Sequence, residues 1–155
     1  VKEAWSNLDI YTATQALKTF GTGLLPSHYL EMVKSRLYDD DGAAAWTLHR
    51  TVRDFMAAFS PVCPFFTHHI SSTVYGSSAV DVDAFPAPAL GEVDHGTEEG
   101  ARLCALSHDL QEFNGQTWAA KKEQGISLNQ PIEGVAVPEE LVEFEATLTR
   151  MHQLS

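Results

Sequence analysis

The chain has 155 residues, 44% of them hydrophobic and 20% charged, so it can bury a core without disulfides or metal, and wholesale disorder is excluded. No apolar run approaches the ~20 residues that a membrane helix needs, so we expect no membrane contact. The formal net charge of -11 is uneven: residues 1–75 carry seven acids and six bases, whereas residues 76–155 carry fourteen acids and four bases and would repel nucleic acid unless those bases are clustered.

The first two predicted helices are separated by a stretch that contains glycine and proline. Apolar residues recur at helical spacing over residues 8–20 and predict a first helix. The following residues 21–27, GTGLLPS, are poor helix interior and predict a break. Ser27 suits the N-cap of a second helix, which we expect to end near Tyr38, before the acidic turn DDDG.

Two more helices complete the N-terminal half. Residues 43–59 show the periodicity of a third helix, whose buried face consists of Leu48, Val52, Phe55, Met56 and Phe59. Pro64 stands where a fourth helix would start. Helices of this length joined by short polar turns predict a mainly α fold, with a helical bundle over residues 1–76.

The second half predicts a small α+β C-terminal appendage. Alternating apolar and acidic residues followed by prolines predict one short edge strand and a linker over residues 77–96. Thr97 suits the N-cap of a long helix, IEGVAV at residues 132–137 predicts a second strand, and Pro138 opens a last helix. We therefore expect residues 97–155 to fold as a long helix, a short strand and a final helix.

The third predicted helix carries one aromatic and two basic residues on the same face. At about 100° per residue, Trp46, Arg50 and Arg53 fall together, nearly opposite the apolar face. An aromatic plane beside two guanidinium groups can stack a base of an RNA loop and hold its phosphates. The alternative is that Trp46 packs on a neighbouring helix while both arginines pair with acids such as Asp54.

The basic residues of the second helix have a simpler explanation. Lys34 and Arg36 point about 200° apart on this helix, so they do not form one tight pair. Lys34 can pair with Glu31 three residues earlier, and Arg36 can pair with the aspartates at 39–41. These aspartates are explained more simply by a solvated turn than by a site for a divalent ion.

No residue pattern indicates catalysis or a cofactor within this chain. Cys63 and Cys104 each lie in an apolar helical pattern, so we expect two buried reduced thiols, and a disulfide stays open as an alternative. Cys63 with His68 and His69 lacks the second cysteine pair of a zinc site. There is no G-x-S-x-G elbow, and GTG lacks the rest of a phosphate-binding glycine loop.

The chain also carries a series of longer phrases. They are YLEMVKSRLY, then AAWTLHRTVRDFMAAFSPVCPFFTHHI, then FNGQTWAAKKEQGISLNQPIEGVAVPEELVEFEATLTRMHQL. In this order they resemble the C-terminal, anticodon-binding region of archaeal-type valyl-tRNA synthetases, which are class I aminoacyl-tRNA synthetases. The resemblance covers roughly residues 8–154, and YLEMVKSRLY and the KKEQGISL tail are its most specific parts.

The resemblance implies a helical bundle that recognises the anticodon arm of tRNA as part of a cytoplasmic valine–tRNA ligase. The family's signatures HIGH and KMSKS are absent from this chain. ATP, Mg²⁺ and catalysis are therefore expected only of the full-length enzyme, from an upstream domain of the same polypeptide, and no role is expected for DNA. A chain that starts at Val1 fits a fragment of such a polypeptide.

The resemblance also selects the residues expected to contact RNA. Lys121 and Lys122 suit the negative end of the long helix and are weaker candidates than the residues of the bundle. The full set of expected RNA-contacting residues is Lys34, Arg36, Trp46, Arg50, Arg53, Lys121 and Lys122.

The chain departs from the family pattern at two places. Residues 21–28, GTGLLPSH, replace an aromatic-rich phrase and should loosen or break the long first helix, and residues 67–71 read THHIS instead of T-E-E-[IL]-W.

Two alternative functions stay open. One alternative is the anticodon-binding domain of an isoleucyl- or leucyl-tRNA synthetase, since these enzymes share the S-P-x-x-P-F-x-T phrase. The other is an acidic helical protein-interaction module without RNA binding, which the acidic C-terminal half would suit.

Overall fold

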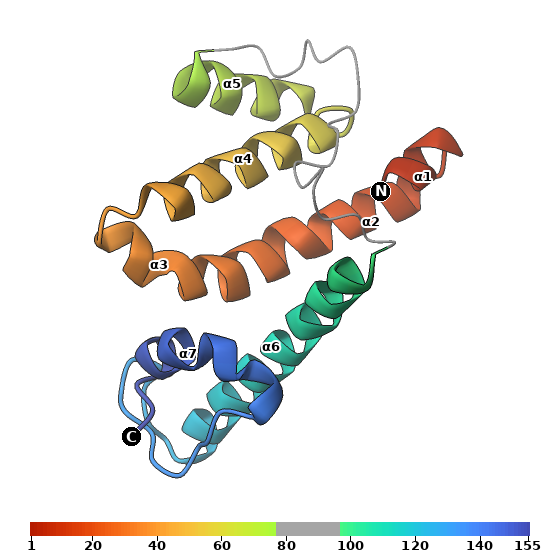
Figure 1. Ribbon diagram of the computed structural model, residues 1–155. Helices are drawn as coiled ribbons and strands as arrows, with labels where there is room; N and C mark the ends of the chain where they lie inside the picture. The colour runs from red at the N-terminus through yellow and green to blue at the C-terminus, as the bar shows by residue number, and fades with distance from the viewer. Residues whose placement is uncertain (77–96) are drawn as a thin grey trace. The chain divides into compact units, whose positions relative to one another are not determined.

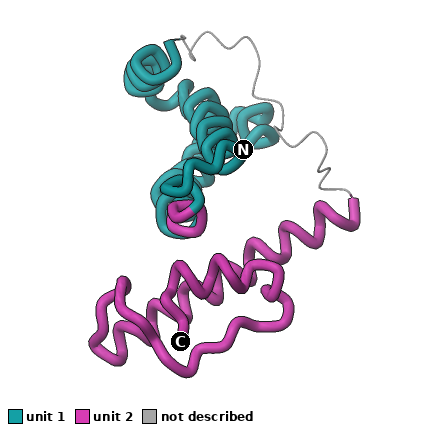
Figure 2. The backbone as a smooth tube through the Cα atoms, turned by 60° about the vertical axis from the view of Figure 1, so that its left-hand side comes forward, with its two compact units in different colours: residues 1–30, 36–91 teal, residues 31–35, 92–155 magenta. Residues whose placement is uncertain are grey.

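The computed structural model describes residues 1–76 and 97–155 (Figure 1), which belong to two compact units. Unit 1 consists of Val1–Leu30 and Arg36–Gly91, and unit 2 consists of Glu31–Ser35 and Glu92–Ser155 (Figure 2). Helices make up the regular structure of the described part of the chain, so the predicted mainly α fold is confirmed. None of the helices described is both long and apolar enough to cross a membrane.

The N-terminal half begins with a long run of helical turns (Figure 1). Its segments are α1 (Lys2–Ser6), α2 (Ile10–Thr19), the π-helix η1 (Phe20–Leu30) and α3 (Glu31–Tyr38). A short turn separates α1 from α2, and the carboxylate of Asp9 caps α2 by accepting a hydrogen bond from the backbone N–H of Thr12 at 3.0 Å. From α2 to the end of α3 the helical turns continue without a loop.

The predicted break at residues 21–27 is wrong, because the chain continues there as a π-helix that includes Pro26. In an α-helix a proline ring clashes with the carbonyl group four residues earlier, whereas the wider π turn bonds to the fifth residue and moves that carbonyl aside. Gly21 also has a packing role, since a Cβ atom there would lie 2.5 Å from Cζ of Phe55. The glycine expected to end the helix instead makes room for the side chain of a neighbouring helix.

The remaining helices of unit 1 pack onto this run. α4 (Gly42–Phe59) returns against α2, and α5 (Pro64–Tyr75) packs on α4. Asp41 is the N-cap of α4, and its carboxylate accepts hydrogen bonds from the backbone N–H groups of Ala43 and Ala44, at 2.9 and 3.1 Å. The ring of Phe55 lies against Phe20 and Phe59, with centroids 5.7 and 5.5 Å apart. These contacts form the predicted helical bundle, whose buried apolar residues include Ala13, Leu17, Ala44, Met56 and Ala58.

Replacing Gly21 with alanine is expected to destabilise unit 1 by about 1–2 kcal/mol, because the new methyl group would push the Phe55 ring away from its neighbours. Gly23 is the matched control. It lies in the same π-helix and a Cβ there meets nothing within 4 Å, so Gly23→Ala should leave stability unchanged or raise it by up to about 1 kcal/mol. Urea unfolding followed by circular dichroism measures both variants. Equal effects of the two substitutions would show that Phe55 is not held against Gly21.

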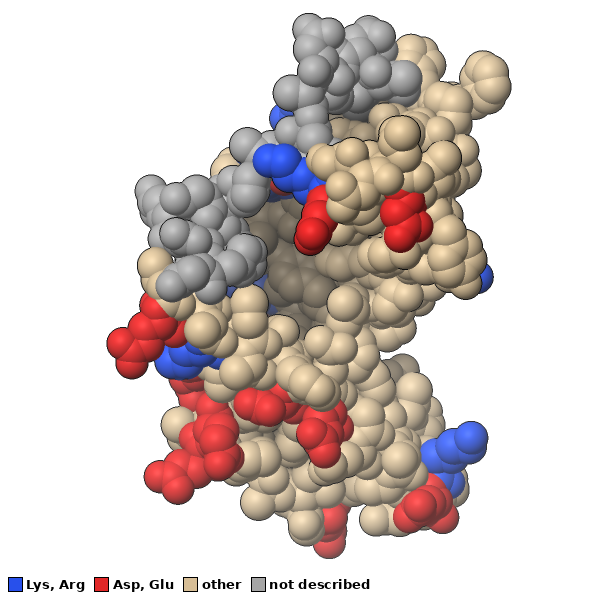
Figure 3. All heavy atoms as spheres, turned by 90° about the vertical axis from the view of Figure 1, so that its right-hand side faces the viewer, with Lys and Arg blue, Asp and Glu red and all other residues tan. Residues whose placement is uncertain are grey.

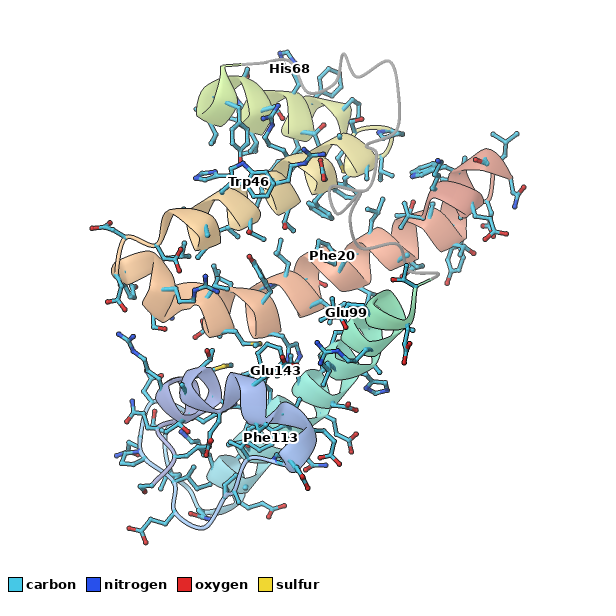
Figure 4. All side chains as sticks on the ribbon, in the orientation of Figure 1. Phe20, Trp46, His68, Glu99, Phe113 and Glu143 are labelled. Carbon is cyan, nitrogen blue, oxygen red and sulfur yellow. The ribbon has the colours of Figure 1, made fainter. Side chains whose placement is uncertain are left out.

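Unit 2 has its own core. Its helices are α6 (Glu98–Glu123), the 3-10 helix η3 (Glu139–Phe144) and α7 (Glu145–His152). The predicted N-cap is confirmed, since the Thr97 hydroxyl accepts a hydrogen bond from the backbone N–H of Gly100 at 3.1 Å. Arg102 joins α6 to η3 by binding both Glu99 and Glu143 (Figure 4). The buried residues of the core are Leu106, Phe113, Leu141 and Leu148.

The predicted α+β character of the appendage is wrong for the part of unit 2 that the structure describes, because these residues form no strand. The expected second strand is reduced to one isolated parallel bridge between Ile132 and Leu154. Strand pairs gain stability from several neighbouring cross-strand contacts, and here the partner segment is the short stretch after α7. The predicted strand and linker over residues 77–96 lie outside the described residues.

Candidate functional site

The aromatic and basic residues predicted to share one face of α4 line a shallow groove between α4 and α5. We call it the α4–α5 groove; it has a volume of about 380 Å³ and is lined by Trp46, His49, Arg50, Arg53, Val74 and Tyr75. The helices place these side chains together because four of them recur at helical spacing on α4 and the other two come from the end of α5. The prediction that Trp46, Arg50 and Arg53 lie on one face is confirmed.

Trp46 is an exposed aromatic residue of the α4–α5 groove. Its surface is 62% exposed, and its ring stands on the α5 side of α4 (Figure 4). The guanidinium carbon of Arg53, also on α4, lies 5.6 Å from the centre of the Tyr75 ring of α5, which is a cation–π distance. The Tyr75 hydroxyl oxygen is 3.2 Å from Nδ1 of His49. The indole is therefore free to stack on a flat group, while Tyr75 holds Arg53 in place.

The two arginines of the groove have different partners. Nε of Arg50 donates hydrogen bonds to both carboxylate oxygens of Asp54, at 3.1 and 3.0 Å. Arg53 makes no ion pair with any described residue of the chain. The alternative interpretation thus holds for Arg50, which pairs with Asp54, but not for Arg53, and the exposed Trp46 does not pack in a helix interface.

His49 and Tyr75 were not predicted as site residues. His49 lies four residues before Arg53, so its place on that side of α4 could have been found from helical spacing. Tyr75 carried no comparable signal, because its place in the groove depends on how α5 packs against α4.

Lys34 and Arg36 on α3 both have the acidic partners that the alternative proposed. Nζ of Lys34 lies 3.2 Å from Oε1 of Glu31, and a guanidinium nitrogen of Arg36 lies 2.7 Å from Oδ2 of Asp41. The hydrogen bond from Arg36, together with those from the α4 backbone, lowers the pKa of Asp41. Because both pairs are partly exposed, they are weak in water, and a phosphate group can replace either carboxylate.

The two lysines at the end of α6 lie in different environments. Lys121 is 0% exposed, and its ammonium group donates hydrogen bonds to the backbone carbonyl oxygens of Leu128 and Gln130 at 2.8 and 2.6 Å. Burial lowers the pKa of Lys121. Lys122 is exposed and lies beside Trp118. Of the two, only Lys122 is accessible to a ligand, and Lys121 instead holds the turn after α6 in place.

A buried polar pair lies close to Lys121. His152 and Asn114 are both 0% exposed, and Nε2 of His152 is 2.7 Å from Oδ1 of Asn114. Because an amide oxygen only accepts hydrogen bonds, the proton is assigned to Nε2. Burial, with a further contribution from the Lys121 charge, lowers the pKa of His152 to about 4. His152 is therefore a neutral structural residue of unit 2.

The surface of unit 2 is acidic. Residues 97–155 contain ten acids and four bases. Of those bases Lys121 is buried, and Arg102 is held by Glu99 and Glu143. On the face shown in Figure 3, acidic side chains predominate over this unit. Unit 1, with nearly balanced charge, is better suited to bind a polyanion.

Cysteines and metal ligands add no second site. Cys63 is half-buried and Cys104 is exposed, and neither forms a disulfide, so the prediction of two buried thiols is wrong for Cys104 and only partly met by Cys63. Cys104 lies outside the apolar face of α6, which packs into the core of unit 2. In the described stretches of the chain, histidine, cysteine and carboxylate side chains do not gather in a group that could hold a metal ion.

Comparison with known proteins identifies relatives of this chain. A family model described as "Anticodon-binding domain of tRNA ligase" matches residues 1–137. Valine–tRNA ligase of Saccharolobus solfataricus is 31% identical over 130 residues, which are 83% of this chain and 15% of that protein. The valine–tRNA ligase of Aeropyrum pernix is 32% identical over 87% of this chain and 17% of its own length. That of Pyrobaculum aerophilum is 30% identical over 98% of this chain and 19% of its own length. No solved structure matches the chain.

The comparisons bear directly on the alternatives left open by the sequence. The chain spans less than a fifth of the length of these three relatives, and all three are valine–tRNA ligases. Neither an isoleucine or leucine enzyme nor an acidic protein-interaction module is favoured by these matches. Because the family model covers residues 1–137, well over half of the sequence, this chain belongs to the family of anticodon-binding domains of tRNA ligases.

Proposed function

We propose that this chain is the anticodon-recognising part of a valine–tRNA ligase. It binds the anticodon arm of a valine tRNA in the cytoplasm, and a catalytic domain of the same, longer polypeptide attaches valine with ATP and Mg²⁺. The observation that carries the proposal is the family match, together with the three relatives named above, each a valine–tRNA ligase. No step of the ATP chemistry is assigned to residues 1–155, which lack the HIGH and KMSKS signatures.

Binding by this module combines charge and stacking. Arginine and lysine side chains hold phosphates of the anticodon arm, and aromatic side chains stack on loop bases, which are unpaired and accessible. Arg36 and Lys34 exchange their partly exposed carboxylate partners for phosphate, and Lys122 is a weaker candidate because it stands among the acidic residues of the segment 97–155. The remaining candidates, Trp46, Arg50 and Arg53, lie in the α4–α5 groove.

The proposal is tested by titrating the chain with a valine tRNA and an isoleucine tRNA at two salt concentrations. The valine tRNA should bind more tightly, and its affinity should fall roughly tenfold to fiftyfold between about 50 and 200 mM salt if two or three phosphates are held. Arg36→Gln should weaken binding and reduce the slope of affinity against salt by about one. Equal binding of both tRNAs would contradict valine specificity.

A matched control separates a phosphate contact from a general change of charge. Lys18 is an exposed cation of α2 in unit 1 and is not among the candidates. Lys18→Gln removes one positive charge, as Arg36→Gln does, and should leave the salt slope unchanged. If both variants lowered the slope equally, Arg36 would contribute only to the overall field of the protein.

A further inference from the structure

The α4–α5 groove offers one flat apolar surface and one positive charge. The flat surface is the indole of Trp46, which is 62% exposed. The charge is the guanidinium of Arg53, because the other arginine of the groove, Arg50, is neutralised by both oxygens of Asp54. Arg53 is exposed and is oriented by the ring of Tyr75 rather than by a carboxylate of the described residues. A ligand suited to this groove has a flat ring and a negative charge on the same small unit.

We propose that the α4–α5 groove holds one unpaired nucleotide of RNA, with its base stacked on Trp46 and its phosphate bound by Arg53. The inference rests on the proposed function and specifies where a nucleotide of the anticodon arm is held. A nucleotide joins a flat base to a phosphate at its sugar, so a single residue of RNA offers a partner to both Trp46 and Arg53. Arg50 is assigned no phosphate, because its guanidinium is paired with Asp54.

The nucleotide must be unpaired for a physical reason. In an RNA duplex the faces of the bases are covered by their neighbours, and the deep major groove does not admit side chains. Trp46 can therefore stack only on a base that has left a helical stack, as in a loop. Stacking requires only the π face of a base, so this contact secures the loop without selecting one base.

The size of the groove limits the ligand to one nucleotide. Its volume of about 380 Å³ lies near the lower end of the range found for small-molecule sites. Besides Trp46, the exposed aromatic ring that the described residues bring to the groove is the imidazole of His49, which lies against Tyr75, and Tyr75 itself is half-buried and covered by Arg53. One base on the indole and one phosphate on the guanidinium fill the site.

The contact can be observed directly on the full chain labelled with 5-fluorotryptophan. The chain has three tryptophans, and each ¹⁹F signal is assigned by its loss in a Trp→Phe variant. A hairpin RNA with the anticodon stem and loop of a valine tRNA should shift the Trp46 signal, whereas the same stem closed into a full duplex should not. Trp46→Ala should weaken hairpin binding by about tenfold or more, since one stacked base is lost.

The control is another exposed aromatic residue of unit 1. Phe65 is 91% exposed on α5 and does not line the groove, so Phe65→Ala should bind the hairpin as the unchanged chain does. Hairpin binding with an unmoved Trp46 signal and no loss in Trp46→Ala would overturn the groove proposal and leave the proposed function intact. If neither the hairpin nor whole valine tRNA bound, the proposed function would fail, and the groove proposal with it.

The roles assigned to the two arginines are separated by salt dependence. Arg53→Gln should reduce the salt slope of hairpin binding by about one, because one phosphate contact is lost. The double variant Arg50→Gln with Asp54→Asn removes the ion pair without changing the net charge, and it should leave that slope unchanged. A slope lowered by the double variant and not by Arg53→Gln would overturn the assignment of the phosphate to Arg53.

Discussion

Replacing Lys121 with methionine is expected to lower the free energy of unfolding of the protein by about 2–4 kcal/mol. The substitution keeps the length of the side chain but removes both hydrogen bonds from the ammonium group to the carbonyl oxygens of Leu128 and Gln130. Hydrogen bonds to a charged group contribute about 1.5–3 kcal/mol each, and because these two bonds are part-buried, water replaces only part of what is lost. Methionine also avoids the cost of burying a charge, which opposes this loss but does not cancel it.

Lys122→Met is the matched control for this prediction. It removes the same charge one residue later in the last turn of α6, but Lys122 is exposed, so stability should change by no more than about 0.5 kcal/mol. Urea unfolding of the three proteins at one pH gives both differences. If Lys121→Met were as stable as the unchanged protein, the ammonium group would not be holding the turn that follows α6.

The helices could be predicted from the sequence because their signals are local. A cap and a stripe at helical spacing each involve residues within a few positions of one another, and this was enough to locate Thr97 at the start of α6 and the buried Met56 of α4. The same spacing brought Trp46 and Arg53 to one face of α4 before any tertiary contact was considered.

What could not be predicted depends on contacts between distant segments. Two lysines in the last turn of a helix are typical of exposed side chains that favour the helix dipole, and only the return of the chain after Gly125 buries the first of them. Pro26 stays within a helix because the turn there is widened and Phe55 occupies the space beside Gly21. Tyr75 joins the groove only through the packing of α5 on α4.

Unit 2 is expected to lose stability as the pH falls from about 6.5 to about 4, by up to about 3 kcal/mol beyond the effect of its carboxylates. Burial lowers the pKa of His152 from 6.5 to about 4, so the folded protein keeps the imidazole neutral. The unfolded chain binds this proton first as the pH falls, which favours unfolding. Above about 6.5 both states are neutral and the contribution to stability is fully present. Below about 4 both states are protonated and the loss is complete.

His152→Gln isolates this contribution. Glutamine stays neutral and can still donate a hydrogen bond to Oδ1 of Asn114, so the variant should show a smaller fall in unfolding free energy over this pH range. The carboxylates titrate in both proteins and cancel in the difference. His108→Gln, at an exposed position of α6, should follow the unchanged protein. Parallel curves for His152→Gln and the unchanged protein would show that His152 is not enclosed.

In Lys121→Met, loss of the neighbouring positive charge should raise the pKa of His152 and make the pH-dependent loss of stability smaller, because this charge contributes to the lowered pKa.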